Sequence, residues 1–147
     1  MNIGFIGIGA VLAFAAMGSA LGAGAAGMAA VGAWKKCFVQ NKTAPFMLIA
    51  FVGAPLTQTI YGFILMNTLK AAATRAENPA DAGLLLGVGI LGGIAMGLSA
   101  LFQGKAGASA SDALAETGKG FGNYIMVLGL IETVALFVMV FLLGVVG

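Results

Sequence analysis

Histidine is absent from this chain of 147 residues, and cysteine occurs once, as Cys37. The usual imidazole and thiolate ligands of zinc, iron and copper are therefore missing. No disulfide can form within the chain. Charged residues make up only 8% of the sequence, with a net charge of +2. So small and dispersed a positive charge argues against a nucleic-acid partner.

Hydrophobic residues, in contrast, make up 61% of the chain. Four segments carry no charge or a single one: residues 3–34, 43–69, 82–104 and 120–147. Each is longer than the roughly 20 residues that a helix needs to cross a bilayer. Since Met1 and Asn2 provide no basic residue and the first run is too long for a signal peptide, we expect it to be a retained span. The sequence predicts an all-α membrane protein of four transmembrane helices, one membrane domain over 1–147, with no room for a catalytic domain.

The two halves of the chain resemble each other. At an offset of 80 residues, Ser19-Ala20-Leu21 recurs as Ser99-Ala100-Leu101. At an offset of 74, Gln58-Thr59 falls on Glu132-Thr133. Such repeats indicate copies of one supersecondary unit packed together. We therefore predict a duplicated helical hairpin, with the first hairpin over 1–72 and the second over 82–147, in which an amide in the first takes the place of a carboxylate in the second.

Glycine is concentrated in the first and third segments, which hold fifteen of the 24 glycines. Small residues at four-residue spacing let helix backbones approach closely in lipid. This spacing is compatible with ordinary packing in a four-helix bundle. It also suits a crowded inner layer formed by helices one and three, with two and four outside, in a ring of identical protomers. We favour the ring.

The three connections are short and carry most of the charge. Pro45 and Asn78-Pro79 are expected to start the second and third helices, and Thr117-Gly-Lys-Gly to end the third. The first and third connections together hold more basic residues than the second, and the termini hold none. The positive-inside rule then predicts a multi-pass cell-membrane protein with connections 1–2 and 3–4 in the cytoplasm and both termini outside.

One carboxylate, Glu132, lies within the fourth apolar segment. A charged side chain at the centre of a bilayer costs at least about 2.5–3.5 kcal/mol, so such residues are rare and usually functional. No Lys or Arg lies close to it in sequence. We infer that its counter-charge is mobile, a proton or a metal ion.

The second segment offers several polar groups on one helical face. Ala54, Thr57, Gln58 and Tyr61 have the spacing i, i+3, i+4, i+7. Pro55 disturbs the turn before it and frees a backbone carbonyl. In the third segment Gln103 is expected within roughly 5 Å of the depth of Glu132, at about 1.5 Å of rise per residue. Oxygen-bearing groups thus converge on one level around one carboxylate.

This set of oxygens has two interpretations. Hard cations such as Na⁺ prefer oxygen ligands, whereas a proton needs only Glu132 and a hydrogen-bond partner. The amides and the hydroxyl are equally compatible with polar contacts that hold helices together. We favour an ion site, with Tyr61 holding the carboxylate by a hydrogen bond rather than coordinating the ion.

These motifs carry a specific resemblance. The duplicated hairpin, Pro-x-Thr-Gln-x-x-Tyr-Gly at 55–62, Gln-Gly-Lys at 103–105 and Ile-Glu-Thr at 131–133 resemble the rotor-ring proteolipid (K/c type) of V-type ATPases, over essentially the whole chain. The similarity is closest to the bacterial sodium-translocating branch. It implies that Na⁺ is held by Glu132, Gln103, Gln58, Thr57 and the backbone carbonyl of Ala54. Ala54 is smaller than the aliphatic residue often found there.

The resemblance further implies a non-catalytic subunit in a homo-oligomeric ring. The ring would turn against a stator membrane subunit that carries a basic residue, and would attach to the central-stalk subunits of an ATPase or ATP synthase. One Glu in four helices implies one ion per protomer. The alternatives are the same rotor carrying H⁺ and, less favoured, a four-helix antiporter, which would be expected to carry its essential Glu in an early helix.

Overall fold

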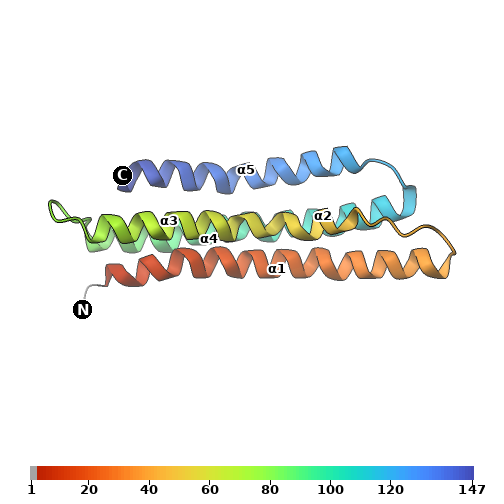
Figure 1. Ribbon diagram of the computed structural model, residues 1–147, viewed down its shortest axis with the longest axis horizontal. Coiled ribbons are helices and arrows are strands. Elements are labelled where there is room, and N and C mark those ends of the chain that lie inside the picture. Colours follow the sequence, from red (N-terminus) through yellow and green to blue (C-terminus); the bar gives the residue numbers. More distant parts are fainter. Residues whose placement is uncertain (1–2) are drawn as a thin grey trace.

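The computed structural model describes residues 3–147, and this part of the chain contains helices and no strand. Met1 and Asn2, whose lack of charge argued against a signal peptide, lie outside the described residues. The elements run lengthwise beside one another (Figure 1). They are α1 (Gly4–Val39), α2 (Leu48–Gly53), η1 (Ala54–Leu56), α3 (Thr57–Ala73), α4 (Ala82–Thr117) and α5 (Phe121–Val146).

Among residues 3–147, four helical spans are long and apolar enough to cross a membrane: Gly4–Val39, Leu48–Ala73, Ala82–Thr117 and Phe121–Val146. The second is made of α2, η1 and α3, and we call it the second span. The predicted all-α fold of four membrane helices is confirmed. Its connections alternate between the two ends of the molecule, so that α1 and α4 run in the same direction (Figure 1).

Two predicted helix starts were wrong. The second span begins at Leu48 rather than at Pro45, whose carbonyl accepts a hydrogen bond from Trp34 Nε1 at 2.8 Å. α4 begins after Asp81 rather than at Asn78-Pro79, because the Asp81 carboxylate accepts from the N–H groups of Gly83 and Leu84 at 2.8 and 3.2 Å. A side-chain acceptor for the first free N–H groups thus marks the start of α4, whereas the start of α2 has no side-chain cap.

The end of α4 follows the sequence prediction. Gly118 adopts a left-handed conformation with φ of 65°, and its N–H donates to the Leu114 carbonyl at 2.8 Å. Gly120, with φ of 89°, precedes α5. Only glycine adopts this conformation without a steric penalty. The two glycines therefore allow the sharp reversal from α4 into α5.

α1 and α4 pack through glycine. A Cβ added at Gly18 would overlap the backbone of Gly97, and one at Gly104 would overlap the backbone of Gly22. Gly7 and Gly89 approach each other in the same way. The close contact between the first and third spans, expected from their glycine content, is confirmed within one chain. We call this contact the α1–α4 seam.

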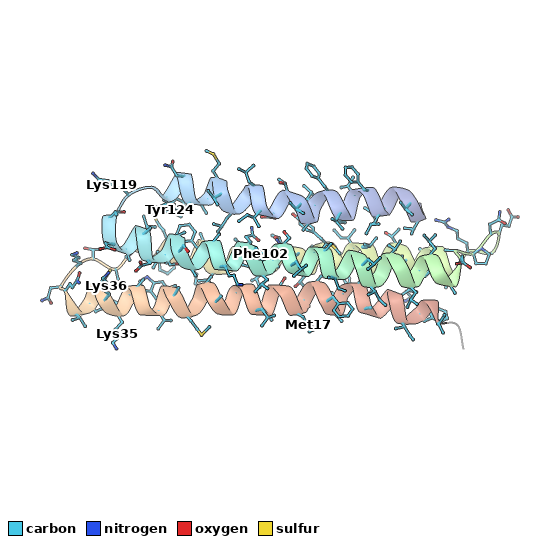
Figure 2. All side chains as sticks on the ribbon, turned by 180° about the vertical axis from the view of Figure 1, so that it is seen from behind. Met17, Lys35, Lys36, Phe102, Lys119 and Tyr124 are labelled. Carbon is cyan, nitrogen blue, oxygen red and sulfur yellow. The ribbon has the colours of Figure 1, made fainter. Side chains whose placement is uncertain are left out.

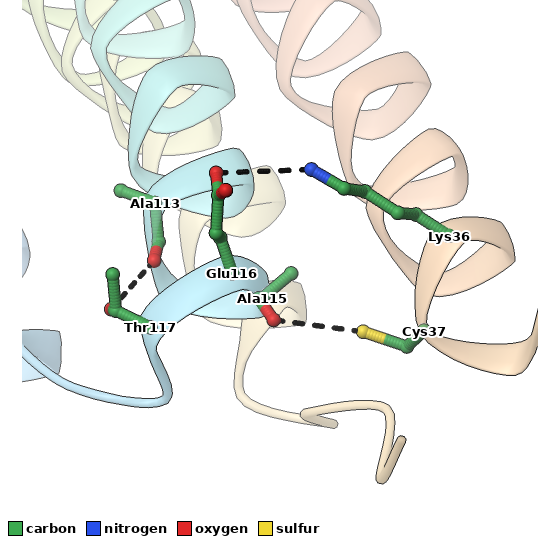
Figure 3. A network of polar contacts seen from close by, with 6 residues as sticks. All are labelled: Lys36, Cys37, Ala113, Ala115, Glu116 and Thr117. Atoms are coloured by element: carbon green, nitrogen blue, oxygen red, sulfur yellow. Dashed lines mark hydrogen bonds and ion pairs between the residues drawn. The ribbon is translucent and has the colours of Figure 1, made fainter. Parts of the chain in front are cut away.

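The end of the bundle that carries the first and third connections is polar. Lys36 forms an ion pair of 3.7 Å with Glu116, and the Cys37 thiol points at the Ala115 carbonyl at 3.8 Å (Figure 3). Lys35, Lys36 and Lys119 lie at this same end (Figure 2). Because Lys36 and Glu116 are 46% and 61% exposed, their ion pair contributes little stability. The ion pair joins the C-terminal ends of α1 and α4.

Candidate functional site

The second span is interrupted where proline was expected to disturb it. α2 ends at Gly53, a 3₁₀ turn covers Ala54–Leu56, and α3 starts at Thr57. Pro55, which is buried, has no N–H and cannot continue the α-helical ladder. Within this turn the Ala54 carbonyl accepts both from the Thr57 N–H and from Thr57 Oγ1, the latter at 3.1 Å. The turn therefore gathers a carbonyl and a hydroxyl at one point of the span.

Two buried glutamines connect this turn to the rest of the bundle. Gln58 Nε2 donates to Gln103 Oε1 at 2.8 Å, and Gln58 Oε1 accepts from Thr57 Oγ1 at 3.1 Å. Both glutamine side chains are 0% exposed. Buried amides without partners would be strongly unfavourable, so this pairing fixes α3 against α4. The second amide group then continues the network, since Gln103 Nε2 donates to α5.

Glu132 accepts a hydrogen bond at each of its carboxylate oxygens. Tyr61 Oη donates to Oε1 at 2.8 Å, and Gln103 Nε2 donates to Oε2 at 3.1 Å and to the Leu128 carbonyl at 3.0 Å. Glu132 itself is half-buried. Hydrogen bonds of this kind hold a carboxylate in one orientation and are stronger than neutral ones. The carboxylate is thereby turned towards α3 and α4.

All six residues singled out in the sequence lie in one connected network. In order of contact they are Ala54, Thr57, Gln58, Gln103, Glu132 and Tyr61. We call this set the polar network. The agreement in depth between Gln103 and Glu132, expected from their distances to the third connection, is realised as a direct contact. Helix packing alone brings together residues that lie 29 to 71 positions apart in sequence.

The polar network lies between two apolar clusters. One contains Ala15, Leu65, Met96 and Met139, and the other contains Leu48, Phe51 and Leu128. Among residues 3–147 no group of three His, Cys, Asp or Glu gathers that could hold a metal ion. The ion pair found in this part of the chain joins Lys36 and Glu116, and it does not involve Glu132. A cation at Glu132 would thus rely on one carboxylate and several neutral oxygens.

Two serines near the network were missed from the sequence. Ser99 Oγ donates to the Ile131 carbonyl at 2.8 Å, immediately before Glu132. Its counterpart in the first repeat, Ser19, is 2% exposed, and its hydroxyl has no hydrogen-bond partner in the described part of the chain. The signal was present in the repeat, which aligns the two serines at an offset of 80 residues. Serine is too common in membrane helices for one copy to stand out.

Comparison with known proteins gives two matches. Residues 86–144, which cover most of α4 and α5, match the family model of the ATP synthase C subunit. The chain is also 32% identical over 135 residues to the A-type ATP synthase subunit K of Methanocaldococcus jannaschii. The aligned region is 92% of this chain but 57% of that relative, so the chain spans a little over half of the relative's length. With four membrane spans among residues 3–147 and these matches, the chain is similar to the C and K subunits of ATP synthases.

Proposed function

We propose that this chain is the ion-carrying subunit of the membrane rotor of an ATP synthase or ATPase, and that each protomer carries one Na⁺ at Glu132. The observation that supports this most directly is that oxygen-bearing groups from three spans share one hydrogen-bonded network with a carboxylate that has no basic partner among residues 3–147. Hard cations select such oxygen ligands. The similarity to ATP synthase subunits supports a role in the rotor, and the polar network is the proposed binding site of the transported ion.

In this proposal the Na⁺ ligands are the side-chain oxygens of Glu132, Gln103, Gln58 and Thr57 and the backbone carbonyl of Ala54. Tyr61 orients the carboxylate through its hydrogen bond to Oε1. The hydrogen bond between Gln58 Nε2 and Gln103 Oε1 would have to open, because an oxygen occupied by a donor is less available to a cation. Binding therefore exchanges hydrogen bonds within the network for coordination of the ion.

The charge of Glu132 couples the movement of ions to rotation of the ring. An unneutralised carboxylate in lipid is costly, so each protomer must travel around the ring with its cation bound. Release would occur where a basic residue of a stator membrane subunit faces Glu132, and reloading would occur from the other side of the membrane. Identical protomers would form the ring, and central-stalk subunits would connect it to the ATP-handling part of the complex.

We propose the orientation and the repeat division that the sequence predicts. Lys35 and Lys36 lie near the end of α1, Lys42 in the first connection and Lys119 in the third, all at the same end of the bundle (Figure 2). The positive-inside rule places that end in the cytoplasm and both termini outside. Residues 1–147 form one membrane domain in this proposal, with hairpins over 1–72 and 82–147.

A rotor that carries H⁺ is the second candidate, and one observation favours it. The Tyr61 hydroxyl, which here donates to Glu132, can rotate and accept a hydrogen bond instead. A protonated Glu132 would then donate to Tyr61 while still accepting from Gln103. A rotor that carries H⁺ would require no change in the hydrogen bonds of Gln58 or Gln103.

Carbodiimide labelling of the intact protein in membranes tests whether the transported ion is Na⁺ or H⁺. The reagent reacts with a protonated carboxyl group, so Glu132 should be labelled in the absence of Na⁺. Addition of Na⁺ should slow the labelling at constant pH, and K⁺ at equal concentration should not. Labelling that follows pH and ignores Na⁺ would reject Na⁺ as the cargo and favour H⁺.

The neutral ligands can be tested separately. Gln103→Leu removes an oxygen and leaves Glu132 Oε2 without its donor, so Na⁺ affinity should fall roughly 10- to 100-fold. Thr57→Val removes one hydroxyl and should lower the affinity roughly three- to tenfold. Na⁺ binding is measured as protection of Glu132 from the carbodiimide.

A matched control is Thr68→Val on α3, where the threonine is partly exposed and its hydroxyl bonds to the Ile64 carbonyl of its own helix. This variant should bind Na⁺ as the unmodified protein does. Unchanged affinity in both Gln103→Leu and Thr57→Val would remove these residues from the site.

A further inference from the structure

Ser19 is a buried hydroxyl that nothing in the proposed function uses. Its side chain is 2% exposed and has no partner among residues 3–147. An unpaired buried hydroxyl is unfavourable, and native proteins contain few of them. A group of this kind is explained if its partner arrives in another state of the molecule.

The packing of α1 against the second span places Ser19 opposite Gln58. A Cβ added at Gly62 would lie 2.7 Å from Ala15 Cβ, and one added at Gly22 would lie 3.1 Å from Pro55 Cβ. Seven residues forward along α1 thus correspond to seven residues back along the antiparallel second span. Ser19 is four residues after Ala15, and Gln58 is four residues before Gly62, so the two lie at the same level.

The two side chains also lie on the facing sides of their helices. Ala15, Ser19 and Gly22 have the spacing i, i+4, i+7, and Pro55, Gln58 and Gly62 have the spacing i, i+3, i+7. All six of these residues are buried. Ser19 and Gln58 therefore both face the contact between α1 and the second span. They do not bond here, because the Gln58 amide is engaged with Gln103 and Thr57.

The second repeat shows what such a serine does when it is satisfied. Ser99 Oγ donates to the carbonyl of Ile131, on the helix that carries Glu132. The corresponding carbonyl of the first repeat would be that of Thr57, next to Gln58. There the chain passes from the 3₁₀ turn into α3, and Ser19 is left unbonded among the described residues. The first repeat thus has a hydroxyl with no partner in the described part of the chain, at the level of an amide.

We infer that Ser19 is a positioning residue for Gln58: when a cation occupies the proposed site, Ser19 Oγ accepts a hydrogen bond from Gln58 Nε2 and holds the amide oxygen towards the ion. This inference rests on the proposed function. A cation requires Gln103 Oε1, which here accepts from Gln58 Nε2, so binding of the cation would free that Nε2 group inside the buried contact between α1 and the second span. Ser19 provides a buried acceptor at that level, with no other partner among residues 3–147.

Ser19→Ala tests the inference in the intact, membrane-embedded protein. Na⁺ affinity, read as protection of Glu132 from carbodiimide, should fall roughly three- to tenfold, as expected for one lost hydrogen bond. Thermal stability without Na⁺ should be unchanged or higher, because no unpaired hydroxyl is left buried. The matched control is Ser99→Ala, which should lower thermal stability and change Na⁺ affinity less than Ser19→Ala does, since Ser99 bonds to a backbone carbonyl.

A double-mutant cycle separates positioning from a general structural effect. In a Gln58→Leu background there is no amide to orient, so Ser19→Ala should cause no further loss of Na⁺ affinity. An equal loss in both backgrounds, or unchanged affinity for Ser19→Ala alone, would overturn the inference while leaving the proposed function intact. If the unmodified protein shows no protection by Na⁺, both the inference and the Na⁺ proposal fail.

Discussion

Glu132→Gln is expected to abolish Na⁺ binding and ion transport while the protein still folds. The carboxylate is the only charged group in the polar network, and removing one partner of a buried charge pair typically costs about 3–5 kcal/mol. This corresponds to a loss of affinity of roughly 100- to 4,000-fold. The substitution also makes the second repeat match the first, which has Gln58 at the equivalent position. A glutamine at this depth is already tolerated once in the fold.

Transport by the complex and carbodiimide labelling of this chain measure the effect. Labelling should disappear, because no other side-chain carboxyl group of the chain lies within the apolar segments. Glu77→Gln, an exposed position in the second connection, is the matched control and should keep both labelling and transport. Transport that survives Glu132→Gln would show that the cargo passes elsewhere.

Gly18→Ala is expected to destabilise the bundle strongly. A Cβ at this position would overlap the backbone of Gly97, and backbone atoms cannot turn aside as a flexible side chain can. α1 and α4 would have to move apart along the α1–α4 seam. Overpacking in a closely packed core costs about 1–3 kcal/mol, and the backbone location puts this change at the upper end of that range or beyond it. Helix association in lipid depends on such close approach.

Thermal unfolding of the detergent-solubilised protein measures the loss. Gly24→Ala on the same helix is the matched control, since an added Cβ there meets nothing within 4 Å. It should change the unfolding temperature little. Equal destabilisation by Gly18→Ala and Gly24→Ala would show that glycine is needed in α1 for a reason other than contact with α4.

The two variants separate two parts of the molecule. The α1–α4 seam brings the two repeats together, and the polar network is assembled across α3, α4 and α5. Glu132→Gln should leave folding intact and remove ion binding, whereas Gly18→Ala should impair both. The opposite pattern would mean that the carboxylate has a structural role. The similarity to ATP synthase subunits C and K also favours the proposed rotor subunit over the four-helix antiporter considered from the sequence.

Most of the architecture could be predicted from local properties of the chain. Four apolar runs of sufficient length define four spans, because in lipid a backbone must satisfy its own hydrogen bonds within a helix. Glycine content indicated which spans approach most closely. Gly118 and Gly120 ended α4 where the sequence placed the break. The start of α4 after Asp81 was missed, since it depends on the Asp81 carboxylate reaching free N–H groups. The start at Leu48 has no side-chain cap that the sequence could have signalled.

The candidate site was predictable as a set of residues but not as a network. Helical spacing placed Thr57, Gln58 and Tyr61 on one face, and depth placed Gln103 level with Glu132. The role of these residues in holding Na⁺ stays a prediction. Neither rule says which amide hydrogen bonds to which oxygen, because that depends on how each helix is rotated about its own axis.

By itself, then, the sequence determined a membrane-spanning, duplicated helical chain with one acidic group at the depth of several amide and hydroxyl groups. These follow from hydropathy, length and rise per residue, which act along the chain. Only the tertiary structure decided that both oxygens of Glu132 are held by Tyr61 and Gln103, and that Ser99 is bonded while Ser19 has no partner among the described residues. Such pairings are set where packed helices fix one another's rotation, and no local pattern encodes that rotation.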